Sequence, residues 1–197
     1  MQKFLVGIDE AGRGPLAGPV SVGAVCVPAD FDFSVLEGAK DSKQMTEKAR
    51  EIIFKKMQEL KKSGAINFVV ALSSAQTIDT KGIVPAIRTA LDGAIGMLKV
   101  NPAECKVLLD GGLKAPVEYT NQETIIKGDA KEKVIALASI AAKVLRDRHM
   151  VKIAEKYPQF GFEIHKGYGT KKHSNAIKEF GLSEIHRRSF CKAFDNL

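Results

Sequence analysis

The sequence predicts one α/β domain, in which helices flank a mixed β-sheet and a helical appendage follows at the C-terminus. Two short apolar runs, the second rich in valine, open the chain, and segments with helical spacing of apolar residues then alternate with further short apolar runs. The 197 residues, 45% of them apolar, suffice for one hydrophobic core, and no repeat or linker-like segment divides them. We therefore expect one domain over residues 1–197, with about residues 158–197 forming the appendage.

The first half of the chain predicts three strands and one helix. Residues 4–8 form a short apolar run, and the valine-rich residues 20–27 predict its antiparallel partner after a Gly/Pro-rich connection. Thr46 precedes a segment with apolar residues at helical spacing that ends at Gly64, which indicates a capped amphipathic helix. Residues 67–72 predict the third strand.

The second half continues the alternation of helices and strands. Residues 84–100 place apolar side chains on one helical face, and residues 106–109 are a short apolar run that predicts a strand. Another short strand is expected at residues 123–126, and residues 131–156 form a long Ala-rich helical pattern, in one piece or two. Strands followed by helices in this order predict a mixed sheet covered by helices.

The chain beyond Pro158 is basic and interrupted by glycines, with helices expected near residues 174–180 and 183–194. Residues 162–173 interleave Tyr168 with cations and glycines. This mixture suits a sugar or base stacked on the ring, with phosphates held nearby. Packing of a loop by Tyr168 is the alternative interpretation.

Charge and cysteine content narrow the class of protein. The net charge of +7 favours polyanionic partners such as nucleic acid, although a basic soluble enzyme is equally compatible with it. The three cysteines lie far apart without a C-x-x-C pair, so neither a disulfide framework nor a cysteine zinc site is indicated. No segment is long enough to span a membrane. We expect a cytoplasmic protein.

Acidic residues stand at the ends of several predicted elements. Asp9 and Glu10 follow the first strand, Asp110 ends another apolar run, and Asp129 follows a glycine just before a helix. Such acids can converge on one patch, where Mg²⁺ or Mn²⁺ would take oxygen ligands. Taken singly, each acid could instead cap an element or form a turn. Asp147 competes with Asp129, but its flanking arginines and helical setting favour a surface ion pair.

A glycine-rich loop follows the first pair of acids. Residues 12–18 lack the Walker motif and the glycine spacing of a dinucleotide-binding loop. Gly12 and Gly14 would let the backbone approach a ligand closely, and the forked guanidinium of Arg13 suits phosphate. We expect the loop to grip a sugar-phosphate backbone beside the acids, the alternative being a tight turn that only the fold requires.

Taken together, these motifs resemble the type 2 ribonucleases H in their single-chain bacterial form. The matching blocks span most of the chain: GIDEAGRG at residues 7–14, DSK at 41–43, LDG at 109–111, KGD at 127–129, ASIAAKVLRD at 138–147 and HKGYGT at 165–170. The resemblance implies the RNase H-like fold, a five-stranded mixed sheet flanked by helices with a helical C-terminal part.

The resemblance also implies an activity. Such an enzyme hydrolyses the RNA strand of RNA–DNA hybrids and cuts on the 5′ side of single ribonucleotides in duplex DNA, leaving 3′-hydroxyl and 5′-phosphate ends. Two Mg²⁺ or Mn²⁺ ions, roughly 4 Å apart, would act in the hydrolysis. The implied metal-binding and catalytic residues are Asp9, Glu10, Asp110 and Asp129. Nothing in the sequence demands a second chain, so we expect a monomer.

The same resemblance assigns residues to the nucleic-acid substrate. Recognition of the ribonucleotide 2′-hydroxyl is implied for Gly12, Arg13, Gly14 and Tyr168. Contacts with backbone phosphates are implied for Lys43, Ser139 and Lys143.

Two alternatives stay open at the level of sequence. The first is a type 3 ribonuclease H that acts only on longer hybrids, although that branch carries a lysine where this chain has Arg13. The second is a catalytically silent nucleic-acid-binding module that relies on the basic C-terminal region. Cleavage of a duplex with one embedded ribonucleotide separates the expected activity from both alternatives.

Overall fold

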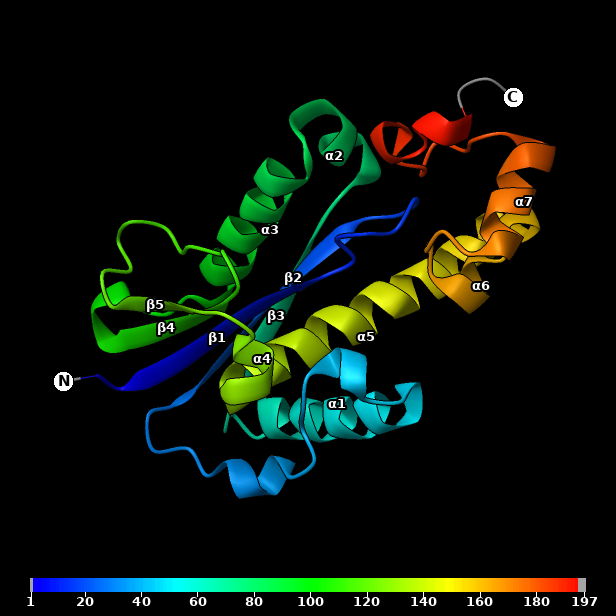
Figure 1. Cartoon of the computed structure of the whole chain (residues 1–197). Coiled ribbons are helices and arrows are strands. Elements are labelled where there is room, and N and C mark those ends of the chain that lie inside the picture. The colour runs from blue at the N-terminus through cyan, green and yellow to red at the C-terminus, as the bar shows by residue number, and fades with distance from the viewer. Residues whose placement is uncertain (1, 195–197) are drawn as a thin grey trace.

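The computed structural model describes residues 2–194 and contains a five-stranded sheet in the order β3-β2-β1-β4-β5 (Figure 1). The strands are β1 Phe4–Ala11, β2 Val20–Pro28, β3 Asn67–Ser73, β4 Cys105–Asp110 and β5 Gln122–Ile125. β1–β2 and β2–β3 are antiparallel pairs, whereas β1–β4 and β4–β5 are parallel. The predicted mixed sheet is thus confirmed. Because β1 and β4 are parallel neighbours, the acids at their carboxyl ends lie at the same sheet edge.

Helices cover both faces of the sheet. α3 (Ile83–Leu98) and the short α2 (Ala75–Lys81) pack on one face, and α1 (Glu47–Lys62) and the long α5 (Lys133–Lys156) pack on the other (Figure 1). α4 (Gly128–Lys131) directly precedes α5. The two apolar layers explain why β2 is buried along nearly its whole length.

α5 lies unusually close to the sheet because two strand glycines face it. A Cβ atom on Gly7 would lie 2.3 Å from the carbonyl oxygen of Val134, and one on Gly23 would lie 2.3 Å from that of Ala138. Any larger residue at either position would push the helix away from the sheet. The close approach fixes the first half of α5, which borders the acids, relative to β1.

The C-terminal part lies beyond the far end of α5 (Figure 1). It contains α6 (Phe162–His165) and α7 (Lys171–Phe180). A third apolar cluster, which includes Met150 of α5 and Phe160, joins this part to Ala17 in the glycine-rich loop. The loop is therefore held between the sheet domain and the C-terminal residues.

One predicted helix is wrong. Residues 183–194 form no α-helix but two short 3₁₀ turns, Arg188–Phe190 and Lys192–Phe194. The main chain ahead of them turns at Glu184 and Ile185 and is extended at His186 and Arg187, where the amide of Arg187 donates to the carbonyl oxygen of Leu16 at 2.8 Å. A backbone that pairs with a distant loop cannot also form the hydrogen bonds of a helix.

The other elements lie close to where the sequence predicts them. The helical pattern of residues 131–156 is broken once, at Glu132 between α4 and α5. α2 was not predicted, because its seven residues are mostly polar and show no apolar period. Further 3₁₀ turns lie at Phe33–Leu36, Ser42–Gln44, Pro102–Glu104 and Pro158–Phe160. Within residues 2–194, no helix has the length and apolarity needed to cross a membrane.

Candidate active site

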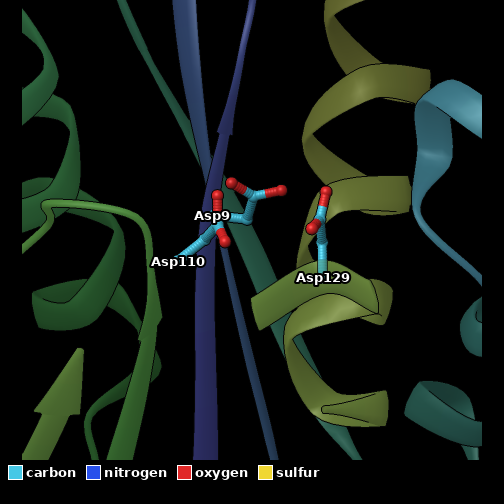
Figure 2. A group of neighbouring side chains, drawn as sticks. All are labelled: Asp9, Asp110 and Asp129. Atoms are coloured by element: carbon cyan, nitrogen blue, oxygen red, sulfur yellow. The ribbon is translucent and has the colours of Figure 1, made fainter. Parts of the chain in front are cut away.

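Three aspartates from three different elements converge at the carboxyl edge of the sheet. Asp9 lies in β1, Asp110 ends the neighbouring strand β4, and Asp129 stands in the first turn of α4. Figure 2 shows their carboxylates pointing toward a common space, and one oxygen of each lies within 4.8 Å of the others. The sequence placed these acids at the ends of elements, and the fold brings them together.

The carboxylate of Asp9 is the most deeply buried of the three, at 1% exposure. Its Oδ1 atom accepts the amide hydrogen of Glu10 at 2.7 Å, whereas its buried Oδ2 atom has no hydrogen-bond partner in the described part of the chain. Burial, with added repulsion from Glu10 and Asp110, raises the pKa of Asp9 well above its ordinary value. An unpartnered buried carboxylate oxygen is unfavourable unless a cation neutralises it.

The other two aspartates are tied to the start of α4. Asp110 Oδ1 accepts the amide hydrogen of Gly128 at 2.6 Å, which joins the end of β4 to the residue before Asp129. Burial and repulsion from Asp110 and Asp41 raise the pKa of Asp129, while the Lys43 ammonium, 4.0 Å away, opposes this shift. Clustered carboxylate oxygens of high proton affinity are the donors that Mg²⁺ and Mn²⁺ prefer. The residues present therefore fit a divalent cation.

Glu10 lies outside this three-aspartate cluster. Its carboxylate instead pairs with the Arg13 guanidinium at 3.1 Å, at the start of the glycine-rich loop. Both acids lie within β1, where consecutive side chains point to opposite faces, so Asp9 and Glu10 diverge. The structure thus separates the two acids that the sequence placed side by side.

Asp147 is not a surface residue, so the predicted location is wrong. It forms the expected ion pairs, with Lys143 at 3.0 Å and with Arg146 at 3.8 Å, but it is only 8% exposed. This part of α5 is covered, because the Arg146 guanidinium donates to the carbonyl oxygens of Ala17, Pro19 and Lys166. The segments that contain Ala17, Pro19 and Lys166 are distant from Asp147 in sequence, so the sequence alone could not predict that Asp147 is buried.

The glycine-rich loop turns its carbonyl groups inward. The fully buried guanidinium of Arg187 donates to the carbonyl oxygens of Gly12, Arg13 and Gly18 at 2.7, 2.9 and 2.9 Å. The amides of Arg13 and Gly14 donate no hydrogen bond within residues 2–194. Because the N–H of a peptide unit points opposite to its carbonyl, these two donors are left for a ligand.

Tyr168 stands beside this loop. Its side chain is half-buried, and the cations of Lys143 and Arg146 lie 5.2 and 5.8 Å from the centre of its ring. The preceding residue, Gly167, accepts the amide hydrogen of Leu16 at 2.8 Å, which ties the two segments together. The fold therefore joins the two glycine-containing motifs that lie at opposite ends of the sequence.

The remaining predicted residues surround the aspartates at different depths. Lys43 is exposed, and although partial burial lowers the pKa of its ammonium, the nearby acids, above all Asp9 and Asp129, raise it overall. Ser139 is buried, and its hydroxyl lies 2.8 Å from that of Ser42. The Ser139 hydroxyl also lowers the pKa of Asp9, which places it beneath the cluster rather than on the surface.

Sequence reasoning missed the two buried arginines, Arg146 and Arg187. The signal for Arg146 was its place in an Ala-rich apolar helix, where an uncompensated cation is unusual. Arg187 gave no such signal, because it stands in an irregular basic segment and its role depends on a loop 175 residues away.

Comparison with known proteins identifies the chain. The Ribonuclease HII family model matches residues 6–193. A Ribonuclease HII from Endomicrobium trichonymphae is 46% identical over 191 residues, which cover 97% of this chain and 87% of that protein. Another from Caldicellulosiruptor bescii is 46% identical over 190 residues, with 96% and 87% covered.

Solved structures agree with these relatives. The crystal structure of ribonuclease H2 from Pyrococcus horikoshii has a TM-score of 0.74 at 26% identity, covering 98% of this chain and 97% of that one. The family match and the two relatives above favour type 2 over the type 3 alternative and over a silent binding module. The chain belongs to the ribonuclease HII family, and it is a metal-dependent endoribonuclease that acts on RNA–DNA hybrids.

Proposed function

We propose that this enzyme also cuts duplex DNA on the 5′ side of a single embedded ribonucleotide. The observation that carries this proposal is the pair of unbonded amides, at Arg13 and Gly14, beside a half-exposed Tyr168 and next to the aspartates. A 2′-hydroxyl both donates and accepts hydrogen bonds, and it alone distinguishes RNA from DNA at one nucleotide. A site that reads this hydroxyl can discriminate strongly against deoxyribose.

Asp9, Asp110 and Asp129 would hold the catalytic cation, and Glu10, which pairs with Arg13 outside the cluster, would have to turn away from Arg13 to join them as a ligand. The orphaned Oδ2 atom of Asp9 supports this assignment, since a cation would neutralise it. When bound, two divalent ions supply Lewis-acid activation for phosphodiester hydrolysis. The all-oxygen donor set suits either Mg²⁺ or Mn²⁺.

The glycine-rich loop and Tyr168 would read the ribonucleotide. Gly14, with open space where a Cβ would stand, lets the backbone approach the sugar, and Gly12 allows the left-handed turn of the loop against Arg146. The amides of Arg13 and Gly14 donate to the sugar, and the Tyr168 ring stacks against it. Arg187 holds the loop in this orientation from behind. The recognition site thus uses main-chain donors that a side-chain substitution does not remove.

Lys43 and Lys143 would contact backbone phosphates on either side of the cut. Lys43 is exposed beside Asp129, and Lys143 lies over the Tyr168 ring. Ser139, which is buried with Ser42 and lowers the pKa of Asp9, would act by stabilising that carboxylate rather than by contact with phosphate. We propose that the enzyme acts as a monomer.

The proposal is tested by an end-labelled cleavage assay with Mg²⁺ or Mn²⁺ on three substrates of one sequence. These are a DNA duplex with one ribonucleotide, the all-DNA duplex and the RNA–DNA hybrid. We expect a single cut immediately 5′ of the ribonucleotide, absent from the all-DNA duplex and abolished by chelator. Cleavage of the hybrid alone would refute the single-ribonucleotide activity while leaving the family activity intact.

A further inference from the structure

Three of the chain's four histidines are buried together next to the main chain of Tyr168. His165, His173 and His186 are 8%, 0% and 2% exposed. The rings of His165 and His173 stack with centres 4.4 Å apart, and the Nε2 atoms of His173 and His186 lie 3.0 Å apart. None of these rings borders the aspartates, so the proposed chemistry does not explain them.

The hydrogen-bond partners fix where the protons of the His173–His186 pair lie. The amide of Ser183 donates to His186 Nδ1 at 2.9 Å, so the proton of neutral His186 lies on Nε2. That proton points at His173 Nε2, which therefore accepts it. The proton of His173 then lies on Nδ1, 3.0 Å from the carbonyl oxygen of Tyr168, to which it donates.

Only neutral rings satisfy this arrangement. An extra proton on His173 would lie on Nε2 and face the Nε2–H of His186, and an extra proton on His186 would lie on Nδ1 and face the amide N–H of Ser183. Burial, together with the neighbouring His165, lowers the pKa of His173 to about 4. Burial, His173, the Arg188 guanidinium and His165 likewise lower the pKa of His186 to about 4.

His165 completes the support of the Tyr168 segment. The amide of Gly167 donates to His165 Nδ1 at 3.2 Å, so the proton of His165 lies on Nε2 and is donated to the carbonyl oxygen of Phe160 at 2.8 Å. The carbonyl of Tyr168 also accepts the amide hydrogen of Thr170 at 2.8 Å. His173 therefore donates to the second lone pair of that carbonyl. Loss of the His173 hydrogen bond would shift Tyr168, while the Thr170 hydrogen bond would keep the segment folded.

The same pair connects both halves of the recognition site. His186 forms an isolated β-bridge with Ala17 of the glycine-rich loop, while His173 is bonded to the main chain of Tyr168. The Nε2 contact between the two rings thus spans from one segment to the other. A change in this contact would alter the distance between the loop amides and the tyrosine ring.

We propose that His173 and His186 are positioning residues, which as a neutral pair hold the Tyr168 ring at a fixed place beside the glycine-rich loop. This inference rests on the ribonucleotide recognition by Tyr168 proposed above. The two histidines touch neither the aspartates nor the surface that would meet the substrate, so they act only through Tyr168 and Ala17.

The first test is ¹⁵N NMR of the imidazole nitrogens in the full-length wild-type protein at pH 7, with His149→Asn used to assign the fourth histidine. We expect the proton on Nδ1 in His173 and on Nε2 in His165 and His186, with none of the three charged. A proton on Nε2 of His173, or a charged His173 or His186, would overturn the proposal. This measurement needs no activity, so it is independent of the proposed function.

The second test separates the two bonds of His173 by a matched pair of variants. The amide nitrogen of His173→Asn takes the place of Nδ1 and keeps the bond to Tyr168, whereas that of His173→Gln takes the place of Nε2 and loses it. On the single-ribonucleotide duplex we expect His173→Gln to raise KM about three- to tenfold, the effect of one hydrogen bond, with little change in kcat. His173→Asn, which keeps the bond to Tyr168 but loses the contact with His186, should raise KM less than His173→Gln does, with His149→Asn as the control for both.

Equal effects of His173→Asn and His173→Gln on KM would overturn the positioning role, as would a loss of kcat without a change in KM. Thermal unfolding of both variants shows whether they are folded, and the NMR measurement on the wild type decides the case if they are not. If the wild type does not cut the single-ribonucleotide duplex, the proposed function fails, and the proton positions still establish or refute the histidine pair.

Discussion

At the scale of single residues, the proposed role of Asp110 is to hold a cation for the reaction without binding the substrate. Its Oδ1 atom already accepts the Gly128 amide hydrogen, and its side chain lies among the acids rather than among the cationic residues. A neutral amide of the same shape replaces a metal-bound carboxylate poorly. Binding of the duplex, which we expect to depend on the cationic residues, should be unaffected.

We therefore predict that Asp110→Asn lowers kcat by at least about 10³-fold, which corresponds to about 4 kcal/mol of lost transition-state stabilisation. Affinity for the duplex, measured by fluorescence anisotropy in the presence of Mg²⁺, should stay within about twofold of the wild type. Asp92→Asn, a change in α3 outside the cluster, is the matched control. Turnover at the wild-type rate would exclude a ligand role for Asp110.

Asp9 is a residue at which function opposes stability. Because its folded pKa is raised, the native state binds its proton more tightly than the unfolded state does. The free energy of unfolding of the metal-free protein therefore falls as pH rises from the ordinary Asp value through the raised pKa. Ionisation of this unpartnered carboxylate therefore destabilises the fold.

We predict that Asp9→Asn abolishes cleavage and raises the Tm of the metal-free protein at pH 7, by about 2–4 °C for each kcal/mol of repulsion removed. Added Mg²⁺ should raise the Tm of the wild type more than that of the variant. Asp79→Asn is the control, for which we expect the Tm to fall. Hydrogen bonds from Ser189 and Arg188 lower the pKa of Asp79 despite partial burial, so its ionised form stabilises the fold. A lower Tm for metal-free Asp9→Asn would contradict the prediction.

Tyr168 distinguishes recognition from packing. Its ring is half-buried and lies beneath two cations, so it contributes little to the core. We predict that Tyr168→Ala lowers kcat/KM on the single-ribonucleotide duplex about 10- to 100-fold, the range expected for a lost stacking contact. Thermal unfolding should shift far less, and Tyr168→Phe, which keeps the ring, should retain more activity. Parallel losses of Tm and activity would favour a packing role.

At the scale of elements, the glycine-rich loop depends on one glycine much more than on another. Gly12 has a φ of +87°, and a Cβ there would lie 2.0 Å from Nε of the buried Arg146. Gly14 has open space around the same position and no left-handed backbone. The two residues look equivalent in the sequence, and only their surroundings distinguish them.

We predict that Gly12→Ala lowers the free energy of unfolding by about 2–4 kcal/mol, through backbone strain and displacement of Arg146. Gly14→Ala, its matched control, should change stability by less than about 1 kcal/mol. Urea unfolding measures both, and cleavage of the single-ribonucleotide duplex should fall much more in Gly12→Ala. Equal stabilities would mean that the loop tolerates a side chain at either position.

The elements also show where local sequence decides structure. Thr46 caps α1 through a hydrogen bond to the amide of Ala49, as its position ahead of an amphipathic period predicts. The segment before Arg188 also contains residues that favour a helix, yet it forms a turn and then extended backbone at His186 and Arg187. There the partner is the glycine-rich loop, and a backbone paired at long range overrides local propensity.

At the scale of the whole molecule, Arg187 joins the C-terminal residues to the active-site loop. Its fully buried guanidinium donates to three carbonyls of the glycine-rich loop, all about 170 residues away in sequence. Removing the donor would leave these carbonyls unsatisfied in a buried environment. Arg188, its neighbour, is exposed and provides a comparison of equal size and charge.

We predict that Arg187→Met lowers the free energy of unfolding by about 3–5 kcal/mol and lowers cleavage of the single-ribonucleotide duplex in the folded fraction. Arg188→Met should change stability by about 0.5 kcal/mol or less. Both variants lose one positive charge, so they have the same net charge. A difference between their free energies of urea unfolding therefore measures how much Arg187 stabilises the loop, apart from any general effect of charge. Similar stability of the two variants would show that the loop holds its shape without Arg187.

The sequence by itself determined the alternation of strands and helices and the candidate acids. Residues 4–8 and 20–27 predict strands because their apolar side chains suit a buried sheet, and the acids at the strand ends follow directly. The glycine-containing motifs around Gly12 and Tyr168 were visible as well. All of these features depend on residues within a few positions of one another, which is the range over which propensity and periodicity act.

Only the tertiary structure decided how these parts meet. It placed Asp9 in the three-aspartate cluster and turned Glu10 toward Arg13, since neighbouring strand residues face opposite sides. It also buried Arg187 against Gly12, a contact across 175 residues, and aligned the histidines behind Tyr168. Such contacts are decided by the packing of distant segments and by the need to pair every buried polar group, neither of which a local pattern contains.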